Sequence, residues 1–349
     1  MAETYRFALV GNPNVGKSSL FNALTGLHQH TGNWPGKTVA TAAGTCSIDG
    51  AAVELIDLPG TYSLSARSPE EEVAAEYISF GCADAVIVVC DATALERNLY
   101  LALQVMEITD HVVICVNLMD EAEKRGITAD LPRLSQMLGV RVVGTSARQK
   151  KTLPPLLRAA VAAAQERHRK PVPVRYGEAI EAGLFSIEAR LDELLPGSMP
   201  NHRWIAMQLL TGGDTAICAL EKKLGRPLEE DPFLSEAVRL GRERIDRAGE
   251  TAAAAATVLL RRAADIAAEV VSVANQNGFS RDRKADRILT GKKFGPGGLQ
   301  HYAAVAADPL LSDGAGRKLP FGVSFLHAFR LWRYSLTLAS RRRNPALAA

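Results

Sequence analysis

A glycine-rich segment, residues 11–18, restricts the fold of this chain more than any other part of its sequence. The segment reads GNPNVGKS and fits the pattern G-x-x-x-x-G-K-[ST]. The apolar run at residues 6–10 is typical of a buried strand, and residues 17–24 have the spacing of a helix. In such a unit the loop points successive N–H groups at phosphate oxygens, and the helix N-terminus adds partial positive charge. The segment therefore predicts a phosphate-binding loop.

Two side chains of this loop have expected roles. Lys17 would reach the β- and γ-phosphates of a nucleotide, and Ser18 would place its hydroxyl on Mg²⁺. The residues expected to contact the nucleotide here are Gly11, Asn12, Pro13, Asn14, Val15, Gly16, Lys17, Ser18 and Ser19.

Short apolar runs and helical stretches alternate through the first 165 residues. Strands are expected at residues 6–10, 53–56, 85–90, 112–116 and 140–143, and helices at residues 17–24, 70–80, 96–107, 131–138 and 153–167. Continuous apolar strands separated by helices are typical of a parallel sheet that is covered on both faces. The predicted fold class is therefore α/β, with a mostly parallel sheet.

Three more polar motifs follow predicted strands. In DLPG, residues 57–60, the Asp could hold Mg²⁺ through water and the Gly could offer its N–H to the γ-phosphate. In NLMD, residues 117–120, the Asp could accept two hydrogen bonds from guanine N1 and N2, which adenine cannot supply. In TSA, residues 145–147, backbone N–H groups could meet guanine O6. The expected contacts are Asp57, Leu58, Pro59, Gly60, Asn117, Leu118, Met119, Asp120, Ser146, Ala147 and Arg148.

Each of these short motifs, taken alone, could equally be a turn at the end of a strand or a helix cap with no ligand. Their order and placement favour a ligand site, because the carboxyl ends of parallel strands meet at one edge of a sheet. Together the four motifs predict a guanine nucleotide site at that edge.

The pattern changes after residue 167. The sequence KPVP at residues 170–173 is a stiff, extended joint, and the following residues read as mostly helical. We expect three parts: a nucleotide-binding domain at residues 1–169, a small all-α domain at residues 170–290 and a partly disordered basic tail at residues 291–349. The tail carries nine Lys and Arg against two Asp.

Composition excludes several classes of protein. The formal net charge of +3 gives no global case for nucleic-acid binding, so no nucleic-acid partner is expected. The five cysteines form no C-x-x-C pair, which disfavours zinc clusters and disulfides and favours a reducing compartment. The N-terminus has no secretory signal pattern, and four charges interrupt the most apolar stretch, residues 251–274. We therefore expect a cytoplasmic location and no transmembrane span.

The order of the four motifs is that of the Ras-like GTPases. More narrowly, the chain resembles the cytosolic N-terminal part of the bacterial ferrous iron transporters of the FeoB family. This likeness is carried by GNPNVGKS at residues 11–18, GNWPGKTV at residues 32–39, DLPGTYSL at residues 57–64 and LERNLY at residues 95–100. It covers residues 5–165 strongly and extends more loosely to about residue 289.

The resemblance implies a P-loop, Ras-like GTPase domain that hydrolyses GTP slowly, followed by a helical, GDI-like coupling domain that slows GDP release and transmits the nucleotide state to a membrane part. It implies that Mg²⁺ is held by Ser18, Thr38 and Asp57, and that a switch loop with Gly36, Lys37, Thr38 and Val39 contacts the nucleotide. It further implies K⁺ at Asn14 and at carbonyls near Gly32 and Trp34. The residues with implied catalytic roles are Lys17, Thr38, Gly60 and Asn14.

Partners and alternatives follow from the same likeness. The implied partners are guanine nucleotides and a membrane iron-permease domain or small accessory Feo proteins, at the cytoplasmic face of the inner membrane. Trp34 is expected to shield a ligand or meet a partner, not to pack in a core. The alternatives are a ribosome-assembly or tRNA-modification GTPase, and a nucleotide-binding regulatory module with negligible turnover. The oligomeric state is not predicted.

Overall fold

The computed structural model describes residues 3–26, 29–34, 39–64, 68–81, 83–166, 170–195, 201–250 and 252–274. Residues 1–274 form one compact unit. The predicted tail at residues 291–349 and the switch-loop residues Gly36, Lys37 and Thr38 lie outside the described residues. The predicted domain boundary near residue 170 stays a prediction.

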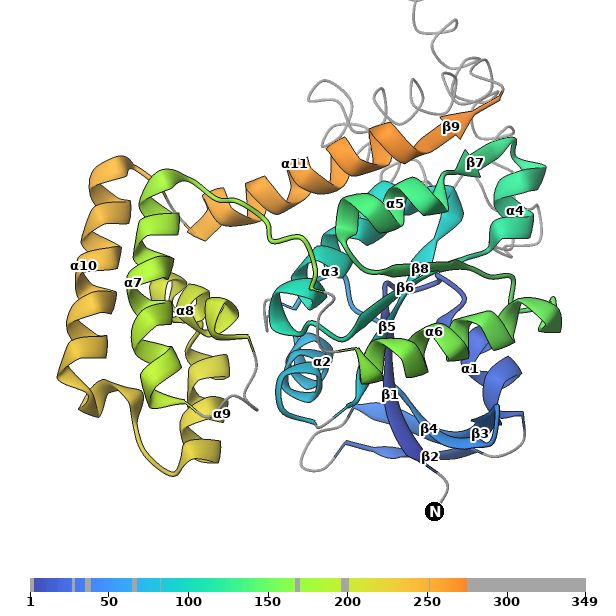
Figure 1. The fold of residues 1–349 in the computed structure, drawn as a ribbon, viewed down its shortest axis with the longest axis horizontal. Helices are drawn as coiled ribbons and strands as arrows, with labels where there is room; N and C mark the ends of the chain where they lie inside the picture. Colours follow the sequence, from blue (N-terminus) through green and yellow to red (C-terminus); the bar gives the residue numbers. More distant parts are fainter. Residues whose placement is uncertain are drawn as a thin grey trace, which may run out of the picture. The chain divides into compact units, whose positions relative to one another are not determined.

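A seven-stranded sheet organises the N-terminal half of the chain, in the order β2-β3-β4-β1-β5-β6-β8 (Figure 1). Strands β1, β4, β5, β6 and β8 pair in parallel, and β2 and β3 join antiparallel at one edge. The strands are β1 (Thr4–Gly11), β2 (Gln29–Asn33), β3 (Ala40–Ile48), β4 (Ala51–Asp57), β5 (Ala85–Asp91), β6 (Val112–Asn117) and β8 (Arg141–Gly144). The predicted mostly parallel sheet is therefore confirmed.

The antiparallel edge was missing from the sequence prediction. The strand β3 joins β4 through a two-residue turn at Asp49 and Gly50, whose φ angles are 51° and 87°. An Asp-Gly pair with positive φ at both residues is a strong signal for a β-hairpin. The signal was therefore present, but the small and polar residues of β3 lack the apolar pattern of the central strands.

Helices cover both faces of the sheet (Figure 1). On one face, Leu20 of α1 and Leu156 of α6 share a core with Leu9 and Ile87 of the sheet. The alternate residues of β5 and β6 are also buried, and α3 packs on these strands. The helices of this half are α1 (Lys17–Thr25), α2 (Pro69–Phe80), α3 (Leu95–Ile108), α4 (Met119–Lys124), α5 (Leu131–Leu138) and α6 (Leu153–Gln165).

The chain from residue 178 onward is mostly helical, as predicted. Its helices are α7 (Glu178–Leu194), α8 (His202–Thr211), α9 (Asp214–Leu224), α10 (Pro232–Ala248) and α11 (Ala252–Val270). Helices α7 and α10 approach closely at two glycines, since a Cβ atom on Gly183 would lie 3.5 Å from the Cα atom of Gly241. Within the described residues, no helix is both long and apolar enough to cross a bilayer.

The end of α11 returns to the N-terminal half. The strand β9 (Val271–Val273) continues directly from α11 and pairs antiparallel with β7 (Ile127–Ala129). The sequence prediction missed both strands, because three residues are too few to show a period.

Candidate nucleotide-binding site

The phosphate-binding loop has the backbone that its sequence predicts. It leaves β1 at Gly11 and enters α1 at Lys17. Asn14 and Gly16 have φ angles of 68° and 79°, so the chain turns sharply before the helix. A Cβ atom on Gly11 would lie 2.6 Å from the Val89 carbonyl oxygen, so the close packing of this loop on the sheet requires glycine there.

Lys17 and Asp57 form a largely buried ion pair between the loop and the end of β4. The Lys17 ammonium also donates to the Leu58 carbonyl. Burial raises the pKa of Asp57, and the neighbouring Lys17 charge partly offsets that rise. The two residues expected to act on phosphate and Mg²⁺ are thus brought together, and here they neutralise each other.

The DLPG segment lies against the phosphate-binding loop. The Leu58 N–H donates to the Leu9 carbonyl at 3.0 Å, and the Thr61 N–H donates to the Gly11 carbonyl at 3.2 Å. A Cβ atom on Gly60 would lie 3.5 Å from the backbone of Pro13. The residues of this segment predicted from the sequence therefore do meet the loop at one edge of the sheet.

The donors at this edge suit a magnesium ion. The exposed Ser18 hydroxyl on the first turn of α1 and the Asp57 carboxylate are oxygen ligands, which Mg²⁺ prefers. No group of three or more His, Cys, Asp or Glu in the described part of the chain could hold a metal ion. Mg²⁺ is commonly bound by one or two carboxylates together with substrate phosphates, so one carboxylate and one hydroxyl fit that mode.

Asn117 connects the third motif to the loop. Its side chain is fully buried; its Nδ2 donates to the Val15 carbonyl at 3.0 Å, and its Oδ1 accepts from the Thr145 hydroxyl at 3.1 Å. A Cβ atom on Gly16 would lie 2.6 Å from this Nδ2, so the second loop glycine makes room for the contact. One amide thus fastens three of the four predicted motifs together.

The last two motifs also contact each other. The Asp120 N–H donates to the Ser146 hydroxyl at 3.2 Å, and the Met119 N–H donates to the Thr145 carbonyl at 3.2 Å. The N–H groups of Thr145 and Ser146 already donate within the protein, to Val116 and Thr152. Arg148 is highly exposed and lies 3.9 Å from Glu121. Met119 and Asp120 are the first two residues of α4, after Leu118 with a φ of 61°.

The residues expected near potassium are only partly described. Asn14 is exposed, and Gly32 pairs with Thr41 in the β2–β3 ladder. Trp34 is half-buried and packs edge-on against Tyr77 of α2, with ring centroids 5.4 Å apart. Trp34 is therefore not among the buried core residues, and its expected role of shielding a ligand or meeting a partner stays a prediction. The Trp34 N–H also donates to the Val39 carbonyl at 2.7 Å, and Val39 is buried.

Helix α3 holds the DLPGTYSL segment, a role that the sequence analysis did not assign. The Arg97 guanidinium lies 4.5 Å from the centroid of the Tyr62 ring, and the Leu64 N–H donates to the Gln104 side chain at 3.0 Å. The backbone carbonyl of Arg97 accepts from the Asn12 side chain at 3.4 Å. Arg97 lies in the LERNLY stretch at residues 95–100, so that stretch was the sequence signal that could have predicted this contact.

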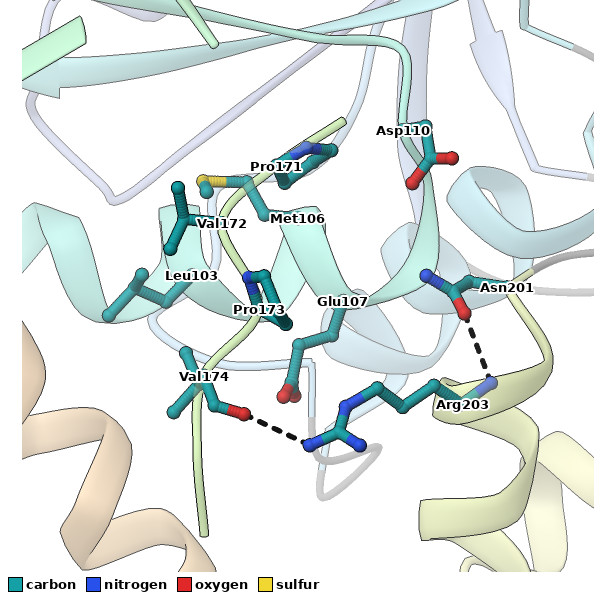
Figure 2. Close-up of a pocket in the computed structure, with 10 residues that line it drawn as sticks. All are labelled: Leu103, Met106, Glu107, Asp110, Pro171, Val172, Pro173, Val174, Asn201 and Arg203. Atoms are coloured by element: carbon teal, nitrogen blue, oxygen red, sulfur yellow. Dashed lines mark hydrogen bonds between the residues drawn. The ribbon is translucent and has the colours of Figure 1, made fainter. Parts of the chain in front are cut away.

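The other end of α3 contacts the helical region. A small cavity there is lined by α3, the extended segment at residues 171–174 and the start of α8 (Figure 2). The Asn201 N–H donates to the Ile108 carbonyl at 3.1 Å, and the Tyr176 hydroxyl donates to Glu107. Burial raises the pKa of Glu107 to about 7.

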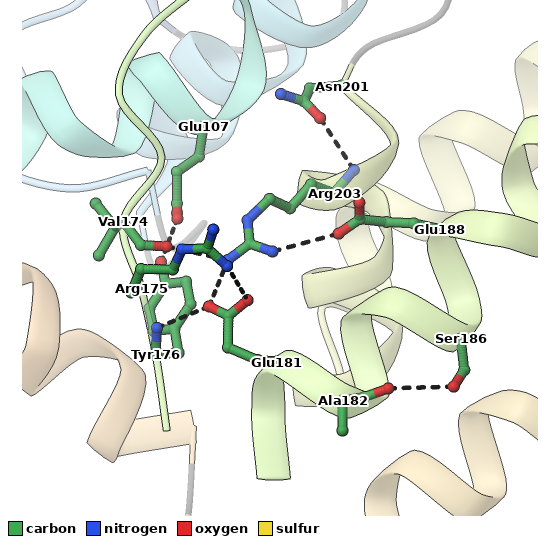
Figure 3. Close-up of polar contacts among 10 residues, drawn as sticks. All are labelled: Glu107, Val174, Arg175, Tyr176, Glu181, Ala182, Ser186, Glu188, Asn201 and Arg203. Atoms are coloured by element: carbon green, nitrogen blue, oxygen red, sulfur yellow. Dashed lines mark hydrogen bonds and ion pairs between the residues drawn. The ribbon is translucent and has the colours of Figure 1, made fainter. Parts of the chain in front are cut away.

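Arg203 organises the helical side of this junction (Figure 3). Its guanidinium donates to Glu181 at 2.7 Å, to the Val174 carbonyl at 3.0 Å and to Glu188 at 3.4 Å. Its charge also lies 5.8 Å from the centroid of the Tyr176 ring. Helix α3 therefore touches the DLPGTYSL segment and the helical region through separate side chains.

Comparison with known proteins identifies the family. Residues 5–160 match the family model described as ferrous iron transport protein B. The apo crystal structure of the cytosolic domain of T. maritima FeoB aligns with a TM-score of 0.64 and 34% identity, over 77% of this chain and 100% of that one. The chain belongs to the FeoB family.

Other FeoB proteins extend this similarity. A GDP-bound mutant of the S. thermophilus FeoB G-domain aligns with a TM-score of 0.68 and 31% identity, over 77% of this chain and 100% of that one. A Porphyromonas gingivalis protein named as a fusion of Fe(2+) transport protein A and the transporter FeoB is 41% identical over 232 residues, 65% of this chain and 26% of that protein. Escherichia coli FeoB is 38% identical over 210 residues, 58% of this chain and 26% of that protein. The match thus spans about a quarter of these curated relatives.

Proposed function

We propose that this chain binds GTP, hydrolyses it to GDP and phosphate, and acts as a nucleotide-dependent switch in ferrous iron uptake. The observation that carries the proposal is the Asn117 side chain, which fastens the NLMD and TSA motifs to the phosphate-binding loop. The solved cytosolic domain of T. maritima FeoB in GDP and GMPPNP forms supports guanine nucleotides as the ligand class.

The base would be selected by Asp120. The Asp120 N–H donates to the Ser146 hydroxyl, which fixes the backbone of Asp120. Its carboxylate would therefore be well placed to accept hydrogen bonds from guanine N1 and N2. Since the N–H groups of Thr145 and Ser146 already donate within the protein, a contact to guanine O6 from this loop falls to Ala147. Adenine would leave the Asp120 carboxylate without donors, and a carboxylate that the base covers but does not hydrogen-bond costs affinity.

The phosphates would be held by the loop and by Lys17. A triphosphate offers Lys17 several charged oxygens in place of its one carboxylate partner, so Lys17 would exchange Asp57 for phosphate. The exchange would leave Asp57 and Ser18 available to Mg²⁺, which would neutralise charge on the phosphates. Thr38 is proposed as the third magnesium ligand from the switch loop.

Hydrolysis would use the protein's backbone more than its side chains. Gly60 would offer its N–H to the γ-phosphate, and Thr61 follows it where a Gln would be needed to orient water. A fixed positive charge is still required as negative charge spreads over the phosphate oxygens. Asn14 and carbonyls near Gly32 and Trp34 are proposed to hold K⁺ for this purpose.

The role in iron uptake is proposed from family membership. The partner would be a membrane iron-permease domain or a small accessory Feo protein, and the fusion of Fe(2+) transport protein A to FeoB in a relative supports the second. A ribosome-assembly or tRNA-modification role receives no support from the comparisons reported above.

Exchange of the base tests the proposal. Wild-type protein should bind GDP and not ADP. In a fluorescence competition titration, Asp120→Asn should weaken the affinity for GDP at least tenfold and strengthen the affinity for xanthosine diphosphate. Glu123→Gln is the matched control, because it neutralises an exposed carboxylate on the same helix. An unchanged GDP preference in Asp120→Asn would remove this carboxylate from the base site.

A second measurement tests hydrolysis. Phosphate release from GTP in KCl should exceed that in NaCl, and Asn14→Ala should abolish the difference. Equal release in both salts would remove K⁺ from the mechanism, and no release in either would leave a binding module.

A further inference from the structure

Arg97, in the first turn of α3, contacts both the phosphate-binding loop and the DLPGTYSL segment. Its backbone carbonyl accepts a hydrogen bond from the Asn12 side chain of the loop at 3.4 Å. Its guanidinium lies 4.5 Å from the centroid of the Tyr62 ring of the segment. One residue of α3 therefore connects the two parts of the chain that would enclose the γ-phosphate.

The Asn12 side chain is almost fully buried where it meets α3. The residue is 3% exposed, and its Nδ2 atom donates to the Arg97 carbonyl. Its Oδ1 atom is buried and accepts no hydrogen bond from the residues that the structure describes. A buried acceptor without a donor costs free energy, so an apolar side chain would stabilise this position as well or better. The amide therefore has a role other than packing, and that role is its contact with Arg97.

The loop holds the DLPGTYSL segment near its middle, and α3 holds it at its end. The Thr61 N–H donates to the Gly11 carbonyl of the loop at 3.2 Å. The Leu64 N–H donates to the Gln104 side chain of α3 at 3.0 Å. Tyr62 directly follows Thr61, so the ring contact with Arg97 begins where the segment leaves the loop.

Gly60, whose N–H would meet the γ-phosphate, lies two residues before Tyr62. It is exposed and has no side chain that could anchor it. Rotation of the peptide planes between Gly60 and Tyr62 would turn this N–H away from the phosphate, and glycine allows such rotation more readily than other residues. A restraint on the Tyr62 ring therefore also restrains the direction of the Gly60 N–H.

The contact between Arg97 and Tyr62 lies at the surface and not in the core. Tyr62 is 46% exposed, and Arg97 is exposed as well. A cation–π contact at an exposed site changes an equilibrium constant by about two- to fivefold. This effect is too small to decide whether the chain folds, but it is large enough to bias the orientation of a short segment.

We propose that Arg97 is a positioning residue for GTP cleavage, because it holds Tyr62 so that the Gly60 N–H faces the γ-phosphate. This role rests on the proposed function and adds to it a residue of α3 that acts through Tyr62. GDP has no γ-phosphate, so the binding of GDP should not depend on the contact between Arg97 and Tyr62.

The test compares single-turnover cleavage of GTP with the affinity for GDP, both measured on the full chain. Arg97→Ala and Tyr62→Ala should each lower the rate constant of cleavage about two- to fivefold, and Tyr62→Phe, which keeps the ring, should match the wild type. The double alanine variant should be no slower than the slower single variant, because both changes remove the same contact. The affinity for GDP should stay within twofold of wild type throughout. Glu96→Ala, at an exposed neighbouring position on α3, is the control.

The outcomes separate this role from the proposed function. If the wild type binds GDP but cleaves no GTP, the proposed hydrolysis fails and the role of Arg97 fails with it. If the wild type cleaves GTP and both alanine variants stay within twofold of it, only the role of Arg97 is overturned.

Three further results would also overturn it. They are losses that multiply in the double variant, an affinity for GDP that falls as much as cleavage does, and a Tyr62→Phe variant as slow as Tyr62→Ala. If Arg97→Ala does not fold, the comparison of Tyr62→Ala with Tyr62→Phe decides alone, because Tyr62 is an exposed residue.

Discussion

The side-chain amide of Asn117 donates a 3.0 Å hydrogen bond to the backbone carbonyl of Val15. Through this bond the last residue of β6, three residues before the proposed base-reading Asp120, holds the phosphate-binding loop. The contact exists because Gly16 has no Cβ atom in its path. In the proposed function, recognition of the base and binding of the phosphates would therefore be coupled through one buried amide.

Removal of this amide should weaken the fold even without nucleotide. Asn117→Ala would leave the Val15 carbonyl and the Thr145 hydroxyl with fewer partners, at a cost of about 1–3 kcal/mol in the free energy of unfolding. Chemical denaturation measures this cost. Asn22→Ala, at an exposed position on α1, is the control and should differ little from wild type. Equal stability of the two variants would show that Asn117 does not hold the loop.

A methyl group on the loop should have a larger effect than the same group elsewhere. Gly16→Ala combines a positive φ of 79° with a Cβ atom 2.6 Å from the Asn117 amide. Gly225→Ala has a similar φ of 72° but no atom within 4 Å of the new Cβ, so it incurs only the backbone strain of about 1–2 kcal/mol. We expect Gly16→Ala alone to weaken GDP binding, at least tenfold by titration. Similar GDP affinities in the two variants would contradict the coupling.

The Lys17–Asp57 pair predicts non-additive stabilities. Lys17→Met should leave a largely buried carboxylate without its partner and cost at most about 3–5 kcal/mol, while Lys17→Met with Asp57→Asn should recover much of that loss. Unfolding at pH 7 without nucleotide measures both. If the double variant loses at least as much stability as Lys17→Met alone, Lys17 and Asp57 are not coupled. The single variant should also lose GTP binding by at least a hundredfold.

Glu107 predicts a pH dependence of stability at the junction with the helical region. Its pKa is raised from 4.5 to about 7, chiefly by burial, so the folded protein holds a proton that the unfolded chain has lost between these values. Stability should therefore fall as pH rises from about 4.5 to 7. Relative to Glu107→Gln, the wild type should lose at most about 3 kcal/mol between pH 4.5 and pH 8.

Urea unfolding at several pH values tests this prediction. Glu96→Gln, at an exposed position near the other end of α3, is the control and should follow the wild type at every pH. A constant difference between Glu107→Gln and the wild type across this range would mean that Glu107 does not titrate there.

The sequence predicted the elements whose period is long enough to see. Strands β1, β4, β5, β6 and β8 and most helices of the N-terminal half have continuous apolar or helical patterns, and each was expected. The strands β7 and β9 were not expected, since three residues show no period. The pairing of β9 with β7 depends on the course of the chain through α11, which no local pattern encodes.

The sequence predicted which residues form the candidate site, but not how they contact each other. The motifs placed Asp57, Asn117 and Asp120 at strand ends, because motif order and parallel topology together determine that edge. The amide of Asn117 was expected only as part of a motif, and its bond to Val15 requires the three-dimensional path of the loop. The packing of Trp34 on Tyr77 was not foreseen, because an aromatic residue in a glycine-rich loop gives no sign of a partner 43 residues away.

The most direct test of the central claim is calorimetric titration of the full chain with GDP and, separately, with ADP, in the presence of Mg²⁺ and K⁺. We predict one site per chain for GDP, an affinity at least a hundredfold higher than for ADP, and loss of the GDP signal in Lys17→Met. Equal affinity for the two nucleotides, or GDP binding that survives in Lys17→Met, would contradict the account.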